Sequence, residues 1–277
     1  YATALKFLAE CLKKYHGCNA IILIDEYDVP LENAYFRGFY EKMIDFLRSL
    51  FESALKTNDN LAFAEITGCL RISKESIFTG LNNLEVISIL SENYSEYFGF
   101  TESEVRAMLE AYGLSDRLEE VKKWYDGYLL KDYQVYNPRA VVSVMLKGEY
   151  KSYWSETASY EAIVPLINMN YDGLKTSIIE MLSGASVKVN TATFKNDTEN
   201  IKSRDDVLTY MIHLGYLGYD QTRKTAFVPN EEIRQELTTA VESKAWNEMI
   251  LFQQESEKLL DATLEMDCPV VAAQIKK

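Results

Sequence analysis

The chain has 277 residues, 47% of them hydrophobic and 26% charged, which provides for a large buried core and excludes general disorder. Its 29 basic and 42 acidic residues give a formal net charge of −13, which disfavours direct binding to nucleic acid or to an anionic membrane. The four cysteines include no C-x-x-C pair, and with two histidines a structural zinc site has little material. Sparse cysteines, and the lack of any apolar run near the ~20 residues that span a bilayer, predict a cytoplasmic protein.

The first strong pattern is an apolar run that ends in acidic residues. Residues 20–24 are continuously apolar and mostly β-branched, which predicts a parallel strand buried on both faces. Asp25 and Glu26 follow at once, at the strand end that opens onto the ligand crevice of an α/β sheet. This is the Walker B pattern of P-loop ATPases, in which Asp25 would hold Mg²⁺ and Glu26 would orient or deprotonate the attacking water.

A helix and a second strand follow at the spacing of a βαβ unit. Apolar residues recur with helical spacing over 35–56, and residues 61–66 form the next apolar run. Adjacent parallel strands end at one edge of a sheet, so Thr67 and Arg71 are expected near Asp25, where they would sense a γ-phosphate. A plainer interpretation stays open, in which the acids lie in a polar loop, Thr67 caps its strand and Arg71 pairs with a carboxylate.

Five segments, in order along the chain, resemble a known protein family. They are residues 23–31, 67–84, 97–105, 124–128 (Trp-Tyr-Asp-Gly-Tyr) and 135–138 (Val-Tyr-Asn-Pro). Together they resemble the AAA-ATPase-like family of uncharacterised bacterial proteins, whose ATPase module is usually followed by a domain similar to PD-(D/E)xK nucleases. The resemblance implies a P-loop ATPase that uses ATP and Mg²⁺. The aromatic residues of 124–128 are expected to be core anchors.

The chain departs from the family in three places. It contains no G-x-x-x-x-G-K-S/T segment, so the loop that cradles phosphate is missing. The family's Tyr-Asn-Pro-Trp-Ser reads Tyr136-Asn137-Pro138-Arg139-Ala140 here, and no nuclease constellation precedes Lys277. The chain also opens in a helical pattern without an initiator Met. We therefore expect a fragment, whose partners in the same polypeptide are an N-terminal P-loop segment and a C-terminal nuclease-like domain.

The remainder of the chain predicts helices and a winged helix. Thr101 and Glu104 have the spacing of a capping box, and two short helices from there to residue 124 fit the lid of AAA-type ATPases. A helix over 204–214, a hairpin and a further helix from residue 230 outline a winged helix. Asp205 and Asp206 would repel phosphates at the start of its recognition helix, so direct nucleic-acid binding is not expected.

We therefore predict an α/β fold in which part of a P-loop ATPase parallel sheet, with a third strand at residues 86–90, precedes a helical lid and a winged-helix-like α+β domain. The predicted segments are 1–95 (partial ATPase core), 96–130 (lid), 131–230 (helical and winged-helix-like) and 231–277 (connector helix). The predicted function is a partial AAA-type ATPase module whose hydrolysis of ATP switches conformation in the full-length protein, with these residues alone inactive. The alternative is a degenerate scaffold or interaction module that does not hydrolyse ATP.

Overall fold

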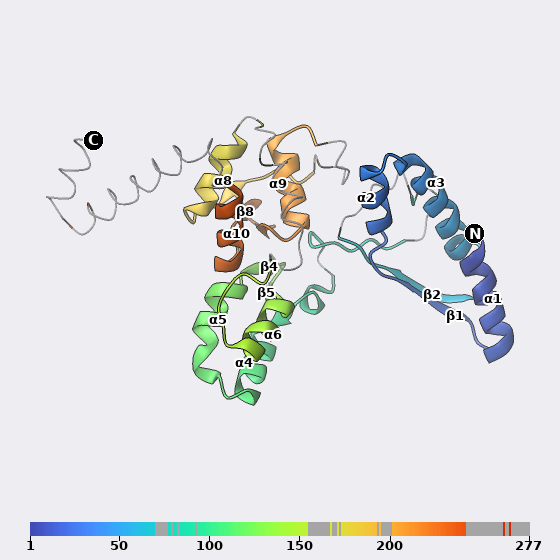
Figure 1. The fold of residues 1–277 in the computed structure, drawn as a ribbon, viewed down its shortest axis with the longest axis horizontal. Helices are drawn as coiled ribbons and strands as arrows, with labels where there is room; N and C mark the ends of the chain where they lie inside the picture. Colours follow the sequence, from blue (N-terminus) through green and yellow to red (C-terminus); the bar gives the residue numbers. More distant parts are fainter. Residues whose placement is uncertain are drawn as a thin grey trace. The chain divides into compact units, whose positions relative to one another are not determined.

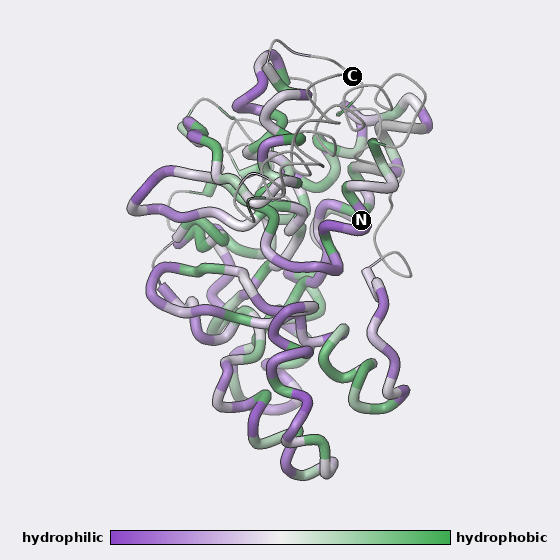
Figure 2. The backbone as a smooth tube through the Cα atoms, turned by 90° about the vertical axis from the view of Figure 1, so that its left-hand side faces the viewer, coloured by the Kyte–Doolittle hydropathy of each residue, from purple (hydrophilic) through white to green (hydrophobic). Residues whose placement is uncertain are grey.

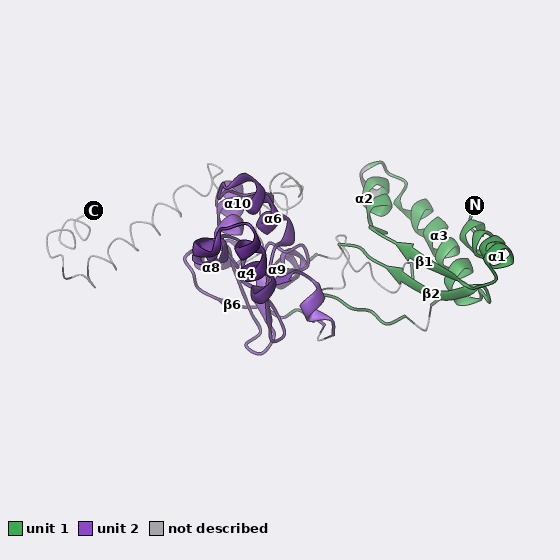
Figure 3. Ribbon diagram, turned by 90° about the horizontal axis from the view of Figure 1, so that it is seen from below, with its two compact units in different colours: residues 1–89, 191–201 green, residues 90–190, 202–277 purple. Residues whose placement is uncertain are grey.

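The computed structural model describes residues 1–69, 77–78, 80–81, 84–91, 93–154, 167, 171, 173–192, 194, 201–241, 263 and 266. The chain divides into two compact units, coloured separately in Figure 3. Unit 1 comprises residues 1–89 and 191–201, and unit 2 comprises residues 90–190 and 202–277. Each unit has its own cluster of buried apolar side chains, so each is described by itself.

Unit 1 is built on two parallel strands. Its elements in chain order are α1 (Ala4–His16), β1 (Ala20–Ile24), α2 (Val29–Phe36), α3 (Tyr40–Phe51), a π-helical turn (Glu52–Lys56) and β2 (Leu61–Ile66). β1 pairs with β2 in parallel, with Ile24 beside Ile66 at the carboxyl ends (Figure 1). Two parallel strands separated by helices confirm the α/β class and the positions of the two predicted strands. The expected burial of the first strand on both faces is wrong, because Ile21 and Leu23 are exposed.

The core of unit 1 lies under α3. Ile44, Leu47 and Phe51 recur at helical spacing on one face of this helix and are buried. The Phe51 ring stacks on the Phe78 ring with 5.9 Å between centroids, and Tyr27 packs edge-on against the Phe78 ring. Figure 2 shows hydrophobic and hydrophilic stretches alternating along the helical parts of the backbone tube.

Two further predictions for unit 1 are wrong. The helical pattern over 35–56 is divided between α2 and α3, because Gly38 adopts a left-handed conformation with φ of 75° that an α-helix does not contain. The expected third strand at residues 86–90 is also absent, although residues 84–91 are described. This short run turns at residues 89–90 and its side chains are at most partly buried, so burial does not drive it into the sheet.

Unit 2 consists of two halves that each combine helices with a small antiparallel sheet. The first half contains β3 (Phe100–Thr101), α4 (Glu102–Ala111), α5 (Leu118–Tyr125), β4 (Tyr128–Leu130), β5 (Tyr133–Tyr136) and α6 (Pro138–Lys147). The second half contains α8 (Leu174–Leu182), β6 (Val187–Lys188), α9 (Arg204–His213), β7 (Gly218–Asp220), β8 (Thr225–Phe227) and α10 (Glu231–Val241). The sheet orders are β3-β5-β4 and β6-β8-β7. The halves meet where β4 lies beside β7 and α10 packs against α5.

Several local predictions for unit 2 are confirmed. The capping box forms at the start of α4, where Glu104 Oε2 accepts the Thr101 N–H at 2.8 Å. The predicted hairpin is the antiparallel pair of β7 and β8. Tyr125, from the 124–128 motif, is among the largest fully buried side chains and is a core anchor as expected, whereas Trp124 and Tyr128 are partly buried. Within the described residues, every helix is too short or too polar to cross a lipid bilayer.

Candidate functional site

The carboxyl ends of β1 and β2 bring Asp25 and Thr67 together. Pairing continues one step beyond the strands, because the Thr67 N–H donates to Ile24 O at 2.8 Å and the Tyr27 N–H donates to Thr67 O at 3.0 Å. These two backbone bonds hold position 67 beside position 25. The Thr67 hydroxyl then donates a hydrogen bond to Asp25 Oδ1. The register of a parallel pair thus places an acid and a hydroxyl, 42 residues apart in sequence, in direct contact.

This contact leaves one oxygen of the carboxylate available. Asp25 and Thr67 are both exposed, and Oδ2 of Asp25 has no hydrogen-bond partner within the described residues. A hydroxyl that donates to one carboxylate oxygen restricts rotation of the carboxylate while the second oxygen faces solvent. Such an oriented oxygen can ligate Mg²⁺, which keeps several water ligands and takes one or two protein carboxylates.

Glu26 lies at the point where the chain leaves the sheet, in an unusual backbone conformation. Its φ of 52° is left-handed, which costs a residue with a Cβ about 1–2 kcal/mol. The carbonyl of Glu26 accepts the Val29 N–H at 3.2 Å, so the residue forms the turn that leads into α2. Strain of this kind gathers at functional sites. The turn leaves the Glu26 side chain exposed directly after Asp25.

Two neighbours that sequence reasoning did not select also shape this edge. Tyr27 and Asp28 are buried, and their side chains lie against Gly68. A Cβ at Gly68 would lie 2.7 Å from Tyr27 Cε1 and 2.8 Å from Asp28 Oδ1, so no side chain fits there. The available signal was the Thr-Gly pair directly after the apolar run of β2. Gly68 thereby allows the segment after β2 to pack closely on the segment after β1.

The described residues of unit 1 do not supply the other components expected of a nucleotide site. Arg71 lies outside the described residues. Across the described ranges, no three His, Cys, Asp or Glu side chains converge in a way that could hold a metal ion. The exposed Asp25 carboxylate fits the donor set of Mg²⁺, but a carboxylate and a hydroxyl do not supply the N–H donors and the lysine that bind phosphate.

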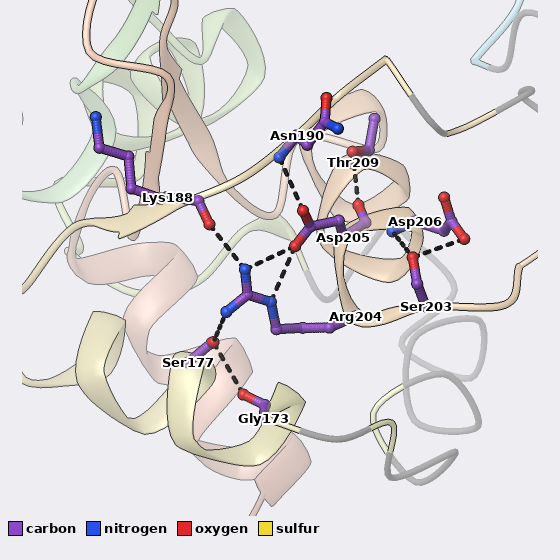
Figure 4. Close-up of polar contacts among 9 residues, drawn as sticks. All are labelled: Gly173, Ser177, Lys188, Asn190, Ser203, Arg204, Asp205, Asp206 and Thr209. Atoms are coloured by element: carbon purple, nitrogen blue, oxygen red, sulfur yellow. Dashed lines mark hydrogen bonds and ion pairs between the residues drawn. The ribbon is translucent and has the colours of Figure 1, made fainter.

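The acidic start of α9 is occupied by contacts within unit 2 (Figure 4). The Arg204 guanidinium donates to Asp205 Oδ1 at 2.7 Å and to Lys188 O at 3.0 Å. Ser203 caps the helix, because its hydroxyl oxygen accepts the Asp206 N–H at 3.2 Å. These carboxylates therefore stabilise the helix start and its packing on the strand that contains Lys188.

Comparisons with known proteins cover the segment that contains the candidate residues. Residues 1–78, which include Asp25, Glu26, Thr67 and Arg71, match the model of a family described as Predicted AAA-ATPase. This segment is therefore similar to that AAA-ATPase-like family. The match confirms, over these residues, the resemblance seen in the sequence.

The chain is also similar to a much longer protein. An uncharacterized protein from the vnfD 5' region of Azotobacter chroococcum mcd 1 is 36% identical over 164 residues. The alignment covers 57% of this chain and 31% of that relative, so the chain spans about a third of the relative's length. No solved structure matches the chain.

Proposed function

We propose that unit 1 is the Mg²⁺-binding part of an ATP-hydrolysing site, and that hydrolysis in the full-length protein switches the conformation of unit 2. The observation that carries the proposal is the contact between Asp25 and Thr67 at the shared carboxyl edge of two parallel strands, within the segment that the AAA-ATPase-like family matches. Ligand sites of open α/β sheets lie outside this edge.

Each residue of the edge has a proposed role. Asp25 ligates Mg²⁺ through the oxygen that Thr67 leaves free, and Thr67 orients that carboxylate and senses the γ-phosphate. Glu26, exposed on its strained turn, orients or deprotonates the attacking water. Arg71 is proposed as a second contact to the γ-phosphate. ATP and Mg²⁺ are thus the proposed cofactors.

The open face of the sheet supports a partner segment in the same polypeptide. Ile21, Leu23 and Phe63 lie on one face of β1 and β2 and are 63%, 71% and 57% exposed. Parallel sheets are covered on both faces in folded proteins, because their strands are apolar on both sides. We propose that an N-terminal P-loop segment covers this face and supplies the phosphate cradle, and that a nuclease-like domain follows the chain.

Unit 2 is proposed to respond to the ATPase module, with its first half as the lid and its second half as a winged helix. The order α8, β6, α9, β7, β8 and α10, with an antiparallel β6-β8-β7 sheet, supports the second assignment. Residues 206–212 of α9 are all buried, which leaves this helix no open face for a DNA groove. The thiols of Cys11 and Cys18 are free, which supports a reducing, cytoplasmic location.

Turnover by the full-length protein separates hydrolysis from a scaffold role. Replacing Glu26 by Gln keeps the size of the side chain and removes the base, so the rate of ATP hydrolysis should fall about 100-fold or more. Glu41→Gln, which changes an exposed carboxylate on α3, is the matched control and should keep the wild-type rate. Wild-type turnover by Glu26→Gln, or no turnover by the wild-type protein, favours the scaffold.

A further inference from the structure

A buried carboxylate joins the two halves of unit 2. Glu232 lies in the first turn of α10 and is fully buried. Its Oε1 accepts two backbone N–H groups, from Tyr153 at 2.7 Å and from Trp154 at 2.9 Å. Its Oε2 lies 3.4 Å from Asn137 Nδ2, at the start of α6. One side chain of the second half thus binds two separate segments that follow the first half's sheet.

Further contacts between the two halves of unit 2 lie next to Glu232. We call this contact region the seam and define it as Pro229–Glu232 against Asp126–Tyr128 and Asn137. The Asn230 amide donates to Asp126 O at 2.8 Å, and its oxygen accepts the Ile233 N–H at 3.0 Å and caps α10. A Cβ at Gly127 would lie 2.0 Å from Pro229 O, so the backbones meet there without a side chain between them. The motif residues 126–128 and 137 therefore hold the start of α10.

Burial raises the pKa of Glu232 and favours its neutral form, against hydrogen-bond donors that favour the ionised form. Its hydrogen-bond partners are all uncharged, and it makes no ion pair within the described residues. Glu236, one turn further along α10, is also buried and carries the same charge. Among the residues that the structure describes, the phenols of Tyr125 on α5 and Tyr128 on β4 face Glu232 from other elements. A buried carboxylate without a cation is costly to ionise.

Arg234, the nearest cation on α10, is engaged elsewhere. Its guanidinium donates to Leu182 O at the end of α8 and lies 3.5 Å from Glu231. It therefore ties α10 to α8 and leaves the buried carboxyl of Glu232 uncompensated.

We propose that Glu232 is a proton-operated latch on the seam, which holds the two halves of unit 2 together when neutral and loosens them when ionised. Oε1 accepts both backbone N–H groups in either state, whereas Oε2 accepts only a long bond of 3.4 Å from the Asn137 amide, so the proton of the neutral form adds to Oε2. The latch depends on contacts within unit 2 and is independent of the ATPase proposal.

The direction of the pH dependence follows from the carboxyl's surroundings. Burial raises the pKa of Glu232 from 4.5 to about 7, against the opposing effect of the Tyr153 and Trp154 N–H groups, and Glu236 adds to the rise. In an opened seam the carboxyl regains water and an ordinary pKa, so the closed seam binds the proton more tightly. Acid therefore favours the closed seam. Between the two pKa values the opening constant rises by up to about tenfold per pH unit, and it levels off above the higher one.

Amide hydrogen exchange of Tyr153 and Trp154 tests the latch in this chain. Between about pH 5.5 and 6.5 the protection factors, corrected for intrinsic exchange, should fall about tenfold in the wild type. Glu232→Gln keeps an acceptor oxygen for both amides and cannot ionise, so its protection should not change with pH. Glu231→Gln, at the neighbouring partly exposed position, should behave as the wild type. In the Glu236→Gln variant the protection factors should level off at a lower pH, because removing the like charge lowers the pKa of Glu232.

Two outcomes overturn the proposal. One is a wild-type protection factor that is the same at both pH values, and the other is a folded Glu232→Gln variant that keeps the wild-type slope. If Glu232→Gln does not fold, ¹³C titration of the Glu232 carboxyl in the wild-type chain decides. A midpoint near neutral pH supports the latch, and a midpoint below about pH 5 overturns it.

Discussion

The Thr67 hydroxyl determines what Asp25 can do. By donating to Oδ1 it fixes the orientation of the carboxylate and leaves Oδ2 toward solvent. Groups that orient a metal ligand affect affinity nearly as much as the ligand itself, and their loss typically costs about 10–100-fold. The pair therefore gives the metal-binding proposal a test that is separate from catalysis by Glu26.

We expect Asp25→Asn and Thr67→Val to weaken Mg²⁺·ATP binding by the full-length protein. Asn lacks the anionic oxygen, and Val keeps the shape of Thr without its hydroxyl, so both should raise Kd about tenfold or more. Calorimetry with and without Mg²⁺ measures the effect. Binding of ATP without Mg²⁺ should change little in either variant. Equal losses with and without Mg²⁺ would contradict a metal role for Asp25.

Much of this edge could be predicted from the residues alone. Strand-end acids and the parallel arrangement follow from apolar runs, so the proximity of Asp25 and Thr67 was expected before the structure. The left-handed backbone of Glu26 and the packing of Tyr27 and Asp28 against Gly68 were not expected. They depend on how two loops pack in three dimensions, and a local pattern of residue types does not contain that information.

Elements were predictable where one strong local signal dominates. The capping box of α4 and the hairpin of β7 and β8 have such signals and formed as expected. The run at residues 86–90 is apolar apart from Ser88, yet it is not a strand, because strand formation depends on a partner strand and on burial. β1 and β2 are formed although one of their apolar faces is exposed. Because strands depend on partners, this exposed face supports the proposed covering segment.

We expect Leu23→Lys to change the free energy of unfolding little in this chain and to lower it clearly in the full-length protein. In this chain position 23 is exposed, so the free energy of unfolding should change by no more than about 0.5 kcal/mol. If the proposed P-loop segment covers the face, the same substitution buries an unpaired charge and should cost about 2 kcal/mol or more. Urea unfolding of both proteins measures the difference.

Val142→Lys is the matched control for this comparison. Val142 is an exposed aliphatic residue on α6 in unit 2, and its substitution should have a small effect in both lengths of protein. Similar small effects of Leu23→Lys in the two proteins would show that the face stays open, and would contradict the proposed covering segment.

At the scale of the whole molecule, two units with separate cores share one chain that spans about a third of its relative's length. The family match is confined to residues 1–78, and the seam that contains Glu232 lies within unit 2. Nucleotide chemistry and the proton latch are therefore proposed for different units. Each can be tested without disturbing the residues that carry the other.

We expect this chain alone to bind Mg²⁺·ATP with a Kd weaker than about 1 mM, which corresponds to about −4 kcal/mol. Its candidate site offers carboxylates and a hydroxyl, and the chain as a whole has a net charge of −13, so a triphosphate meets repulsion that one Mg²⁺ offsets only in part. A P-loop would add several backbone N–H donors and a lysine, and the full-length protein should accordingly bind in the micromolar range. Calorimetry on both proteins measures the difference between the two Kd values for Mg²⁺·ATP. Micromolar binding by this chain would place the phosphate site among its own residues and would overturn the assignment of phosphate binding to another segment.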